Sequence, residues 1–371
     1  MKKFFAVLAA AALAALPGFT DEFNLSGEVK TGLYWEKVQD GDGEVSSNNA
    51  KLHNTDDAGN NEGRLRLNFH YRHDTIGMKL RIQESDWGSQ TLKWGETFPY
   101  AFIYGNFLDD RIKLSAGGLG DSPWGIGGPE EWDELDTGVI GIRTEIKSAF
   151  IPGLNIGFVL NDWNAIEPEG EERTLGDLLQ ESVLGASYDH EYFGLRFACR
   201  LDSKADFYTS DADGINGAEL IYRLEERSLK NLLPGFQIWA NGHYKGINKE
   251  DNTLFRTANV LYIQYAPELF TAQIRLGCDT GWKRQELNVR GSFCYNILNF
   301  LSAGASASYI QDYETKISPG SPFSEWNVEP MVKVTLGGAY IEFVYHYGRE
   351  YTSPDVETKT HWINLRLVYT F

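Results

Sequence analysis

The sequence lacks the features that define several large protein classes. Its 3 Cys among 371 residues are too few for a disulfide scaffold, and none forms the Cys-x-x-Cys pair of a zinc site. One long apolar run, at the N-terminus, and a mean hydropathy of −0.36 exclude a polytopic helical membrane protein. Basic residues number 34 against 52 acidic ones, and phosphate repels a chain of net charge −18. We expect no nucleic-acid partner, no metal site and no cofactor.

The single apolar run has the pattern of an export signal. Lys2 and Lys3 precede an Ala/Leu-rich stretch from Phe4 to Leu16, and Pro17 follows. This stretch is shorter than the ~20 residues that a membrane-spanning helix needs, as is typical of signal peptides. We predict a signal peptide at residues 1–20, with an uncertain cleavage site and an uncleaved anchor helix as the alternative. Residues 21–371 are predicted to form a single domain.

Glycine and aromatic residues are abundant, and hydrophobic residues recur at every second position. The chain holds 38 Gly and 13% aromatic residues. In one segment Leu65, Leu67, Phe69 and Tyr71 alternate with charged and polar residues, and similar segments of about ten residues recur along the chain. This pattern predicts an all-β chain. Its strands would have one apolar face and one polar face.

The connections between these segments alternate between short and long. The predicted short connections are 73–75, 109–110, 151–153, 190–192, 228–235, 266–268, 296–299 and 337–338. The predicted long ones are 38–62, 120–137, 161–181, 202–216 and 311–324. Transmembrane β-barrels sort their connections in this way, with short periplasmic turns and longer outer loops. The count of segments predicts about 18 antiparallel strands, with 16 as the alternative.

The C-terminus ends on an amphipathic segment in which Ile363, Leu365, Leu367, Tyr369 and Phe371 alternate with polar residues. With this ending, the sequence resembles bacterial outer-membrane β-barrels of the porin type. The resemblance implies a transmembrane antiparallel barrel in the bacterial outer membrane, surrounded by lipid. It also implies that the barrel assembly machinery recognises Tyr369 and Phe371, and that the chain forms a homotrimer.

A barrel of 16–18 strands encloses water, so the polar faces of its strands are the candidate functional surface. Five basic residues of this parity are predicted to line the pore: Arg64, Arg66, Lys79, Arg81 and Arg143. The resemblance to general porins suggests that one long loop, here 120–137, folds inward and opposes these cations. The candidate constriction residues of that loop are Asp121, Trp124, Glu130, Glu131, Asp133 and Asp136. The alternatives are an external acidic loop, or stacking of sugar rings on Trp124.

These observations predict a porin-like channel for passive diffusion of small hydrophilic solutes or ions. The first alternative is a surface adhesin or structural barrel with a filled lumen. The second is a selective transporter of sugars or hydrophobic compounds. No enzyme is expected, because a lipid-hydrolysing barrel needs a serine beside a histidine and the sequence has no His-x-Ser pair.

Overall fold

The computed structural model describes residues 22–52, 64–84, 100–119, 124, 140–162, 179, 182–200, 215–248, 254–281, 284–312, 323–353 and 356–371. The predicted signal peptide lies outside this part. The strands are β1 (Glu22–Asp40), β2 (Val45–Leu52), β3 (Arg64–His73), β4 (Ile76–Glu84), β5 (Tyr100–Phe107), β6 (Ile112–Gly118), β7 (Ile140–Ile146), β8 (Leu154–Asp162), β9 (Val183–Asp189), β10 (Phe193–Arg200), β11 (Ile215–Glu226), β12 (Phe236–Asn248), β13 (Leu254–Tyr265), β14 (Phe270–Gly281), β15 (Arg284–Leu298), β16 (Leu301–Asp312), β17 (Phe323–Leu336), β18 (Ala339–Ser353) and β19 (Val356–Thr370). A short helix, α4 (Ser228–Leu232), lies between β11 and β12.

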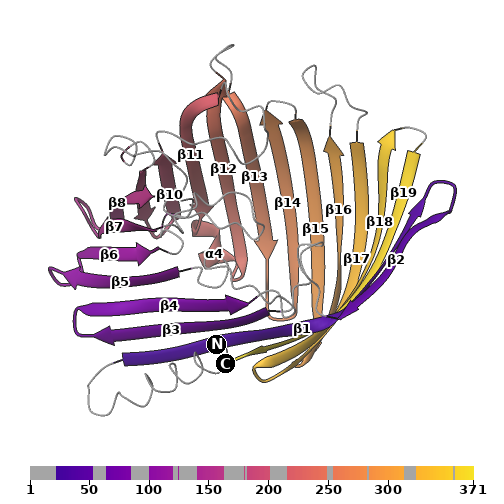
Figure 1. Cartoon of the computed structure of the whole chain (residues 1–371), viewed down its shortest axis with the longest axis horizontal. Helices are drawn as coiled ribbons and strands as arrows, with labels where there is room; N and C mark the ends of the chain where they lie inside the picture. Colours follow the sequence, from indigo (N-terminus) through magenta and orange to yellow (C-terminus); the bar gives the residue numbers. More distant parts are fainter. Residues whose placement is uncertain are drawn as a thin grey trace, which may run out of the picture.

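The strands form one closed antiparallel sheet (Figure 1). Each strand from β3 to β19 pairs with the next, and β1 closes the ring by pairing with both β19 and β3. β2 pairs with residues 33–39 of β1, whereas β3 pairs with residues 22–30. Because β2 and β3 follow one another along the same edge of β1, they share one position in the ring. The barrel therefore has the 18 strands that we predicted.

Side-chain exposure alternates along the strands, with apolar residues on the outer face and polar residues on the inner face, as a membrane barrel requires. Ile103 and Ile142 are 61% and 54% exposed on the outer face, whereas Arg143, beside Ile142, is 4% exposed inside. Among the described residues, each strand of the ring has a paired neighbour on both sides, as lipid requires of a membrane-spanning sheet, whereas β2 pairs with β1 alone. The sequence pattern thus produces a barrel with an apolar outside and a polar inside.

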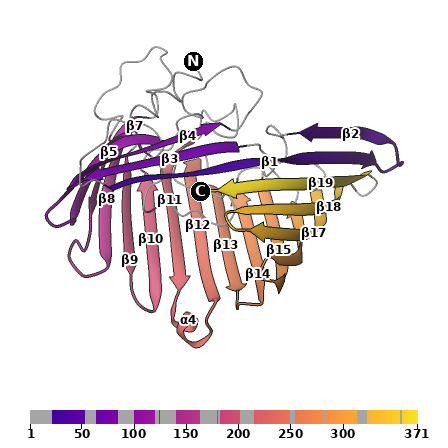
Figure 2. The same cartoon turned by 90° about the horizontal axis from the view of Figure 1, so that it is seen from below.

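The connections predicted to be short lie at one end of the barrel, and the longer α4 connection lies with them (Figure 2). The opposite end also has short connections, because only two residues separate β14 from β15 and β18 from β19. No described helix combines the length and the apolar character that crossing a membrane requires. One predicted loop is wrong in part. The segment 38–62 contains strand residues at its start and β2 at 45–52, which forms a hairpin with β1. The sequence VSSNNAKL of β2 is polar on both faces, so alternation could not reveal it.

The first described strand and the C-terminus meet at the short-turn end. Gly27 of β1 and Phe371 exchange two backbone hydrogen bonds of 2.9 and 3.1 Å, which extend the β1–β19 pairing. The Phe371 ring lies over Gly27, where an added Cβ would be 2.4 Å from the ring. Tyr369 stacks against Phe371 with a ring separation of 5.8 Å. The two predicted assembly residues thus lie at the seam that closes the barrel, and their recognition by assembly machinery stays a prediction.

Candidate functional site

The predicted pore-lining residues lie on β3, β4 and β7, which belong to one wall. Arg66 belongs to β3, Lys79 and Arg81 belong to β4, and Arg143 belongs to β7. Their parity is that of the inner face, opposite to the exposed Met78, Leu114 and Ile142. Arg64 is the first residue of β3 and pairs with Lys30, and its side chain lies outside the described part. We call this part of the lumen, formed by β3 to β7, the basic wall.

Three aromatic rings on β5 organise the basic wall. Tyr100, Phe102 and Tyr104 alternate along β5, so all three project into the lumen, with 6.0 and 6.5 Å between successive rings. Each ring carries one cation. Arg81 lies over Tyr100 at 4.7 Å, Arg143 over Phe102 at 5.7 Å and Lys113 over Tyr104 at 5.4 Å. Within about 6 Å of a ring centroid a cation is attracted by the ring's electrons, so β5 fixes a row of positive charges.

Hydrogen bonds and ion pairs with neighbouring side chains also hold the cations of the basic wall. Arg81 Nε donates to Asn68 Oδ1 at 2.8 Å, and Arg66 Nε donates to Gln83 Oε1 at 2.9 Å. Glu145 Oε1 lies 3.0 Å from Arg143 Nε and 3.5 Å from Lys113 Nζ. One carboxylate thus serves two cations, and the wall keeps an excess of positive charge.

A second group of cations and rings lines the lumen on β11 to β14. Trp239 and Tyr262 stack with 3.8 Å between ring centroids, and Arg223 lies 4.9 Å from the Trp239 ring. Arg275 pairs in register with Tyr262 and is 6% exposed. The combination of arginine and aromatic rings therefore occurs on two walls of the same lumen.

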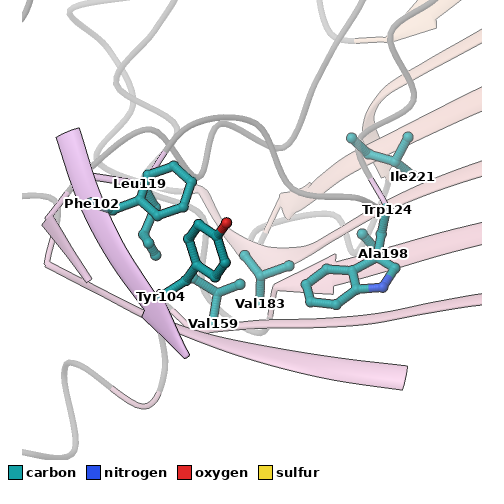
Figure 3. Close-up of a cluster of buried hydrophobic side chains, with 8 residues drawn as sticks. All are labelled: Phe102, Tyr104, Leu119, Trp124, Val159, Val183, Ala198 and Ile221. Carbon is teal, nitrogen blue, oxygen red and sulfur yellow. The ribbon is translucent and has the colours of Figure 1, made fainter. Parts of the chain in front are cut away.

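Of the predicted constriction loop, the structure describes Trp124, which lies in the lumen against β8 and β9. Gly157 and Gly185 are opposite each other in register, and their inner faces form a flat seat for the indole. An added Cβ would lie 2.0 Å from the indole at Gly157 and 2.1 Å at Gly185. A buried cluster surrounds this seat (Figure 3), and its members are Phe102, Tyr104, Leu119, Trp124, Val159, Val183, Ala198 and Ile221.

This placement decides between two interpretations of Trp124. Its side chain is 1% exposed, so no ring face remains for a sugar to stack on, and that alternative is wrong for Trp124. The indole instead attaches this point of the loop to the inner wall, beside the basic wall. The other five constriction candidates, Asp121, Glu130, Glu131, Asp133 and Asp136, lie outside the described residues, and their role stays a prediction.

The sequence pattern did not identify several residues of the lumen. Tyr100, Phe102 and Tyr104 alternate with Ala101, Ile103 and Gly105, so both faces of β5 are apolar and parity could not assign the inner one. Lys113 shares its parity with Ser115, which would have identified its direction, but β6 is short and rich in glycine. Cross-strand pairing, which the sequence does not specify, brings each cation over its ring.

One cluster in the lumen contains the residue types of a hydrolase. Ser306 Oγ donates to Glu329 Oε2 at 2.8 Å, and His346 Nδ1 lies 3.0 Å from Glu329 Oε1. In a serine hydrolase the imidazole lies between the hydroxyl and the acid, so that it can accept the hydroxyl proton. Here the carboxylate lies between them. Arg290 approaches the same carboxylate at 3.5 Å, and the cluster is a hydrogen-bonded network.

The barrel is similar to solved outer-membrane proteins in architecture. The outer membrane channel DcaP of Acinetobacter baumannii matches with a TM-score of 0.58 and 12% identity, covering 96% of this chain and 100% of that one. Pseudomonas aeruginosa OpdQ matches with a TM-score of 0.56 and 11% identity, covering 94% and 98%. OpdK of the same organism, solved with vanillate, gives 0.53 and 12%, covering 94% and 98%.

The fold is that of a porin-type outer-membrane barrel. The prediction from the alternation, the loop lengths and the C-terminal strand is therefore confirmed for the fold. No protein-family model matches the sequence, and no curated protein matches it. With identities of 11–12%, these neighbours show the architecture, and the solute has to be argued from the lumen itself.

Proposed function

We propose that this chain is an outer-membrane channel for passive diffusion of small hydrophilic solutes, and that its lumen favours anions with an aromatic ring. The observation that carries this proposal is the row of three cations fixed over Tyr100, Phe102 and Tyr104. Charged side chains along a pore select for ions of the opposite charge. Phe102 and Tyr104 are 7% and 6% exposed, whereas Tyr100 is only partly buried, so Tyr100 offers a planar apolar surface beside Arg81.

Two cations of this row can be approached from the lumen. Arg81 is partly exposed and the Lys113 side chain is 19% exposed, whereas Arg143 between them is 4% exposed and adds its positive charge from within the wall. Multiple weak sites allow a solute both to enter and to leave a pore. The neighbour OpdK was solved with vanillate, an aromatic carboxylate, and the chemistry of the basic wall suits such a solute.

The competing function is that of a surface adhesin or structural barrel, in which the lumen is filled and the outer loops carry the function. The observation that favours it is the apolar cluster around Trp124, which occupies part of the lumen beside β8 and β9. Ion conductance separates the two proposals.

Recognition by the barrel assembly machinery and assembly into a homotrimer are further parts of the channel proposal that rest on the sequence resemblance. The proposal includes no catalytic activity.

Block of the ion current by an aromatic carboxylate tests the solute preference. We expect vanillate to reduce the current through the refolded protein in a concentration-dependent way, and vanillyl alcohol, its neutral counterpart, to have little effect. Arg81→Gln removes one cation of the row and should weaken the block roughly fivefold, since a contact between unit charges in water contributes about 1 kcal/mol. Equal block by the two compounds, or an Arg81→Gln channel that vanillate blocks as well as the wild type, would contradict the proposed preference.

A further inference from the structure

The outer face of the barrel carries a group of cations and aromatic residues far from the pore. Lys37 of β1, Arg349 of β18 and Lys359 of β19 have the parity of the exposed Phe343, Leu365 and Leu367, so they face away from the lumen. β1, β19, β18 and β17 lie side by side there (Figure 2). In the strand register, Arg349 is opposite Lys359 on one side and Trp326 on the other, and Lys37 is opposite His361. We call Lys37, Arg349 and Lys359 the outer basic cluster.

Specific contacts fix two of these cations. Glu357 accepts from Arg349 at 3.0 Å and from Lys359 at 3.4 Å, and the Tyr351 hydroxyl donates to the same carboxylate at 3.1 Å. Arg349 also donates to the Tyr347 hydroxyl at 2.5 Å. Its guanidinium lies 5.7 Å from the Trp326 ring. The cations are therefore held in place on the surface, and about a third of each side chain remains exposed, 36% for Arg349 and 32% for Lys359.

The height of the cluster matches a lipid headgroup region. Below it on β19, the outward residues Ile363, Leu365, Leu367 and Tyr369 are apolar or aromatic down to the short-turn end. A strand rises about 3.3 Å per residue and tilts by about 40°, so the roughly ten residues from Phe371 to His361 span about 25 Å. The apolar band of an outer-membrane barrel is also about 25 Å tall. The outer basic cluster thus begins where the outer leaflet's headgroups begin.

The charge of this surface is opposite to that of the chain. Among the described residues of this surface, three cations face outward around the carboxylate of Glu357, whereas the whole protein has a net charge of −18. Arginine and lysine bind phosphate through charge-assisted hydrogen bonds, and Arg349 has more donors than Tyr347 and Glu357 accept. The aromatic rings of Trp326 and Tyr347 lie at the same level, as expected for residues at a membrane interface.

We propose that the outer basic cluster binds the phosphate groups of a phosphorylated lipid in the outer leaflet. The acyl chains of this lipid would lie on the apolar residues of β18 and β19 below, such as Phe343 and Leu365. This inference rests on the proposed outer-membrane location, which sets the leaflet, and it is independent of solute passage through the lumen.

Binding of a defined phosphorylated lipid to the folded chain tests the proposal. The probes are lipid A and its dephosphorylated form, added to the full-length protein in detergent, with bound lipid counted by native mass spectrometry. We expect lipid A to bind more tightly than the dephosphorylated form. The double variant Lys37→Gln/Lys359→Gln should lose about 25-fold in affinity, because each basic residue near an anionic surface contributes roughly fivefold.

A matched variant controls for overall charge. Lys147 and Lys230 are exposed at the short-turn end, and Lys147→Gln/Lys230→Gln removes the same charge from the opposite side. It should retain wild-type affinity. If the double variant of the cluster folds poorly, Lys359→Gln alone keeps the Arg349–Glu357 contact and should still lose about fivefold.

Besides normal lipid A binding by the cluster variants, three results would overturn the proposal. They are equal binding of the two lipids, equal loss in the control variant, and competition by inorganic phosphate as strong as that by lipid A, which would indicate a site for free anions. Ion conductance of the same variants separates this inference from the channel function. Cluster variants that still conduct but bind lipid A normally contradict the lipid site alone, whereas a folded protein without conductance contradicts the channel alone.

Discussion

Removing the Trp124 indole should widen the channel and raise its single-channel conductance. The side chain is 1% exposed and lies on Gly157 and Gly185 of the inner wall, so it attaches one point of the loop between β6 and β7 to that wall. Truncating a buried tryptophan to alanine costs about 3–5 kcal/mol, which is enough to release this attachment. We expect Trp124→Ala to give larger current steps in a planar bilayer, with the barrel itself still folded.

A change in the seat should have the same effect without touching Trp124. Gly185→Ala places a Cβ 2.1 Å from the indole, and the three nearest atoms at that site all belong to Trp124. Gly277→Ala is the matched control, because Gly277 also lies on the inner face and its Cβ would meet Asn288 at an ordinary 3.5 Å. Current steps of wild-type size from both Trp124→Ala and Gly185→Ala would show that the attached loop does not narrow the pore.

Reversing two charges of the basic wall should change the ion selectivity of the channel. Arg66 and Arg81 are fixed by Gln83 and Asn68, so glutamate at both positions places negative charge where anions are expected to pass. Each unit charge at contact is worth about 1 kcal/mol in water, or roughly fivefold in relative permeability. The reversal potential of Arg66→Glu/Arg81→Glu across a potassium chloride gradient should therefore move strongly toward cation selectivity.

The control for this reversal carries the same charge change outside the lumen. Lys147→Glu/Lys230→Glu alters two exposed residues at the short-turn end. Surface charges beyond a Debye length, about 10 Å at 0.1 M salt, are largely screened, so this variant should keep the wild-type reversal potential. If the two double variants shift the potential equally, the basic wall does not control selectivity.

The sequence predicted the barrel well because one simple pattern carries the information. Lipid requires an apolar residue at every second position of a strand, so the direction of Arg66, Arg81 and Arg143 could be assigned from parity alone. The lengths of most connections then separated the two ends of the barrel, although β14–β15 and β18–β19 are joined by two residues at the end with the long loops. Both signals are local in the sequence.

The organisation of the lumen could not be predicted in the same way. Both faces of β5 are apolar, so Tyr100 and Phe102 gave no parity signal, and Lys113 lies on a short strand. The seat of Trp124 depends on two glycines, Gly157 and Gly185, that come together only through the register of β8 and β9. Non-local pairing determines these contacts, and a single sequence does not reveal it.

The central claim, that the barrel is a water-filled channel with a cationic lumen, is tested most directly by single-channel recording. The refolded full-length chain is inserted into a planar bilayer across a potassium chloride gradient. The account predicts stepwise currents and a reversal potential on the anion-selective side, despite the net charge of −18. A folded barrel that gives no current steps would contradict the claim and indicate a filled lumen.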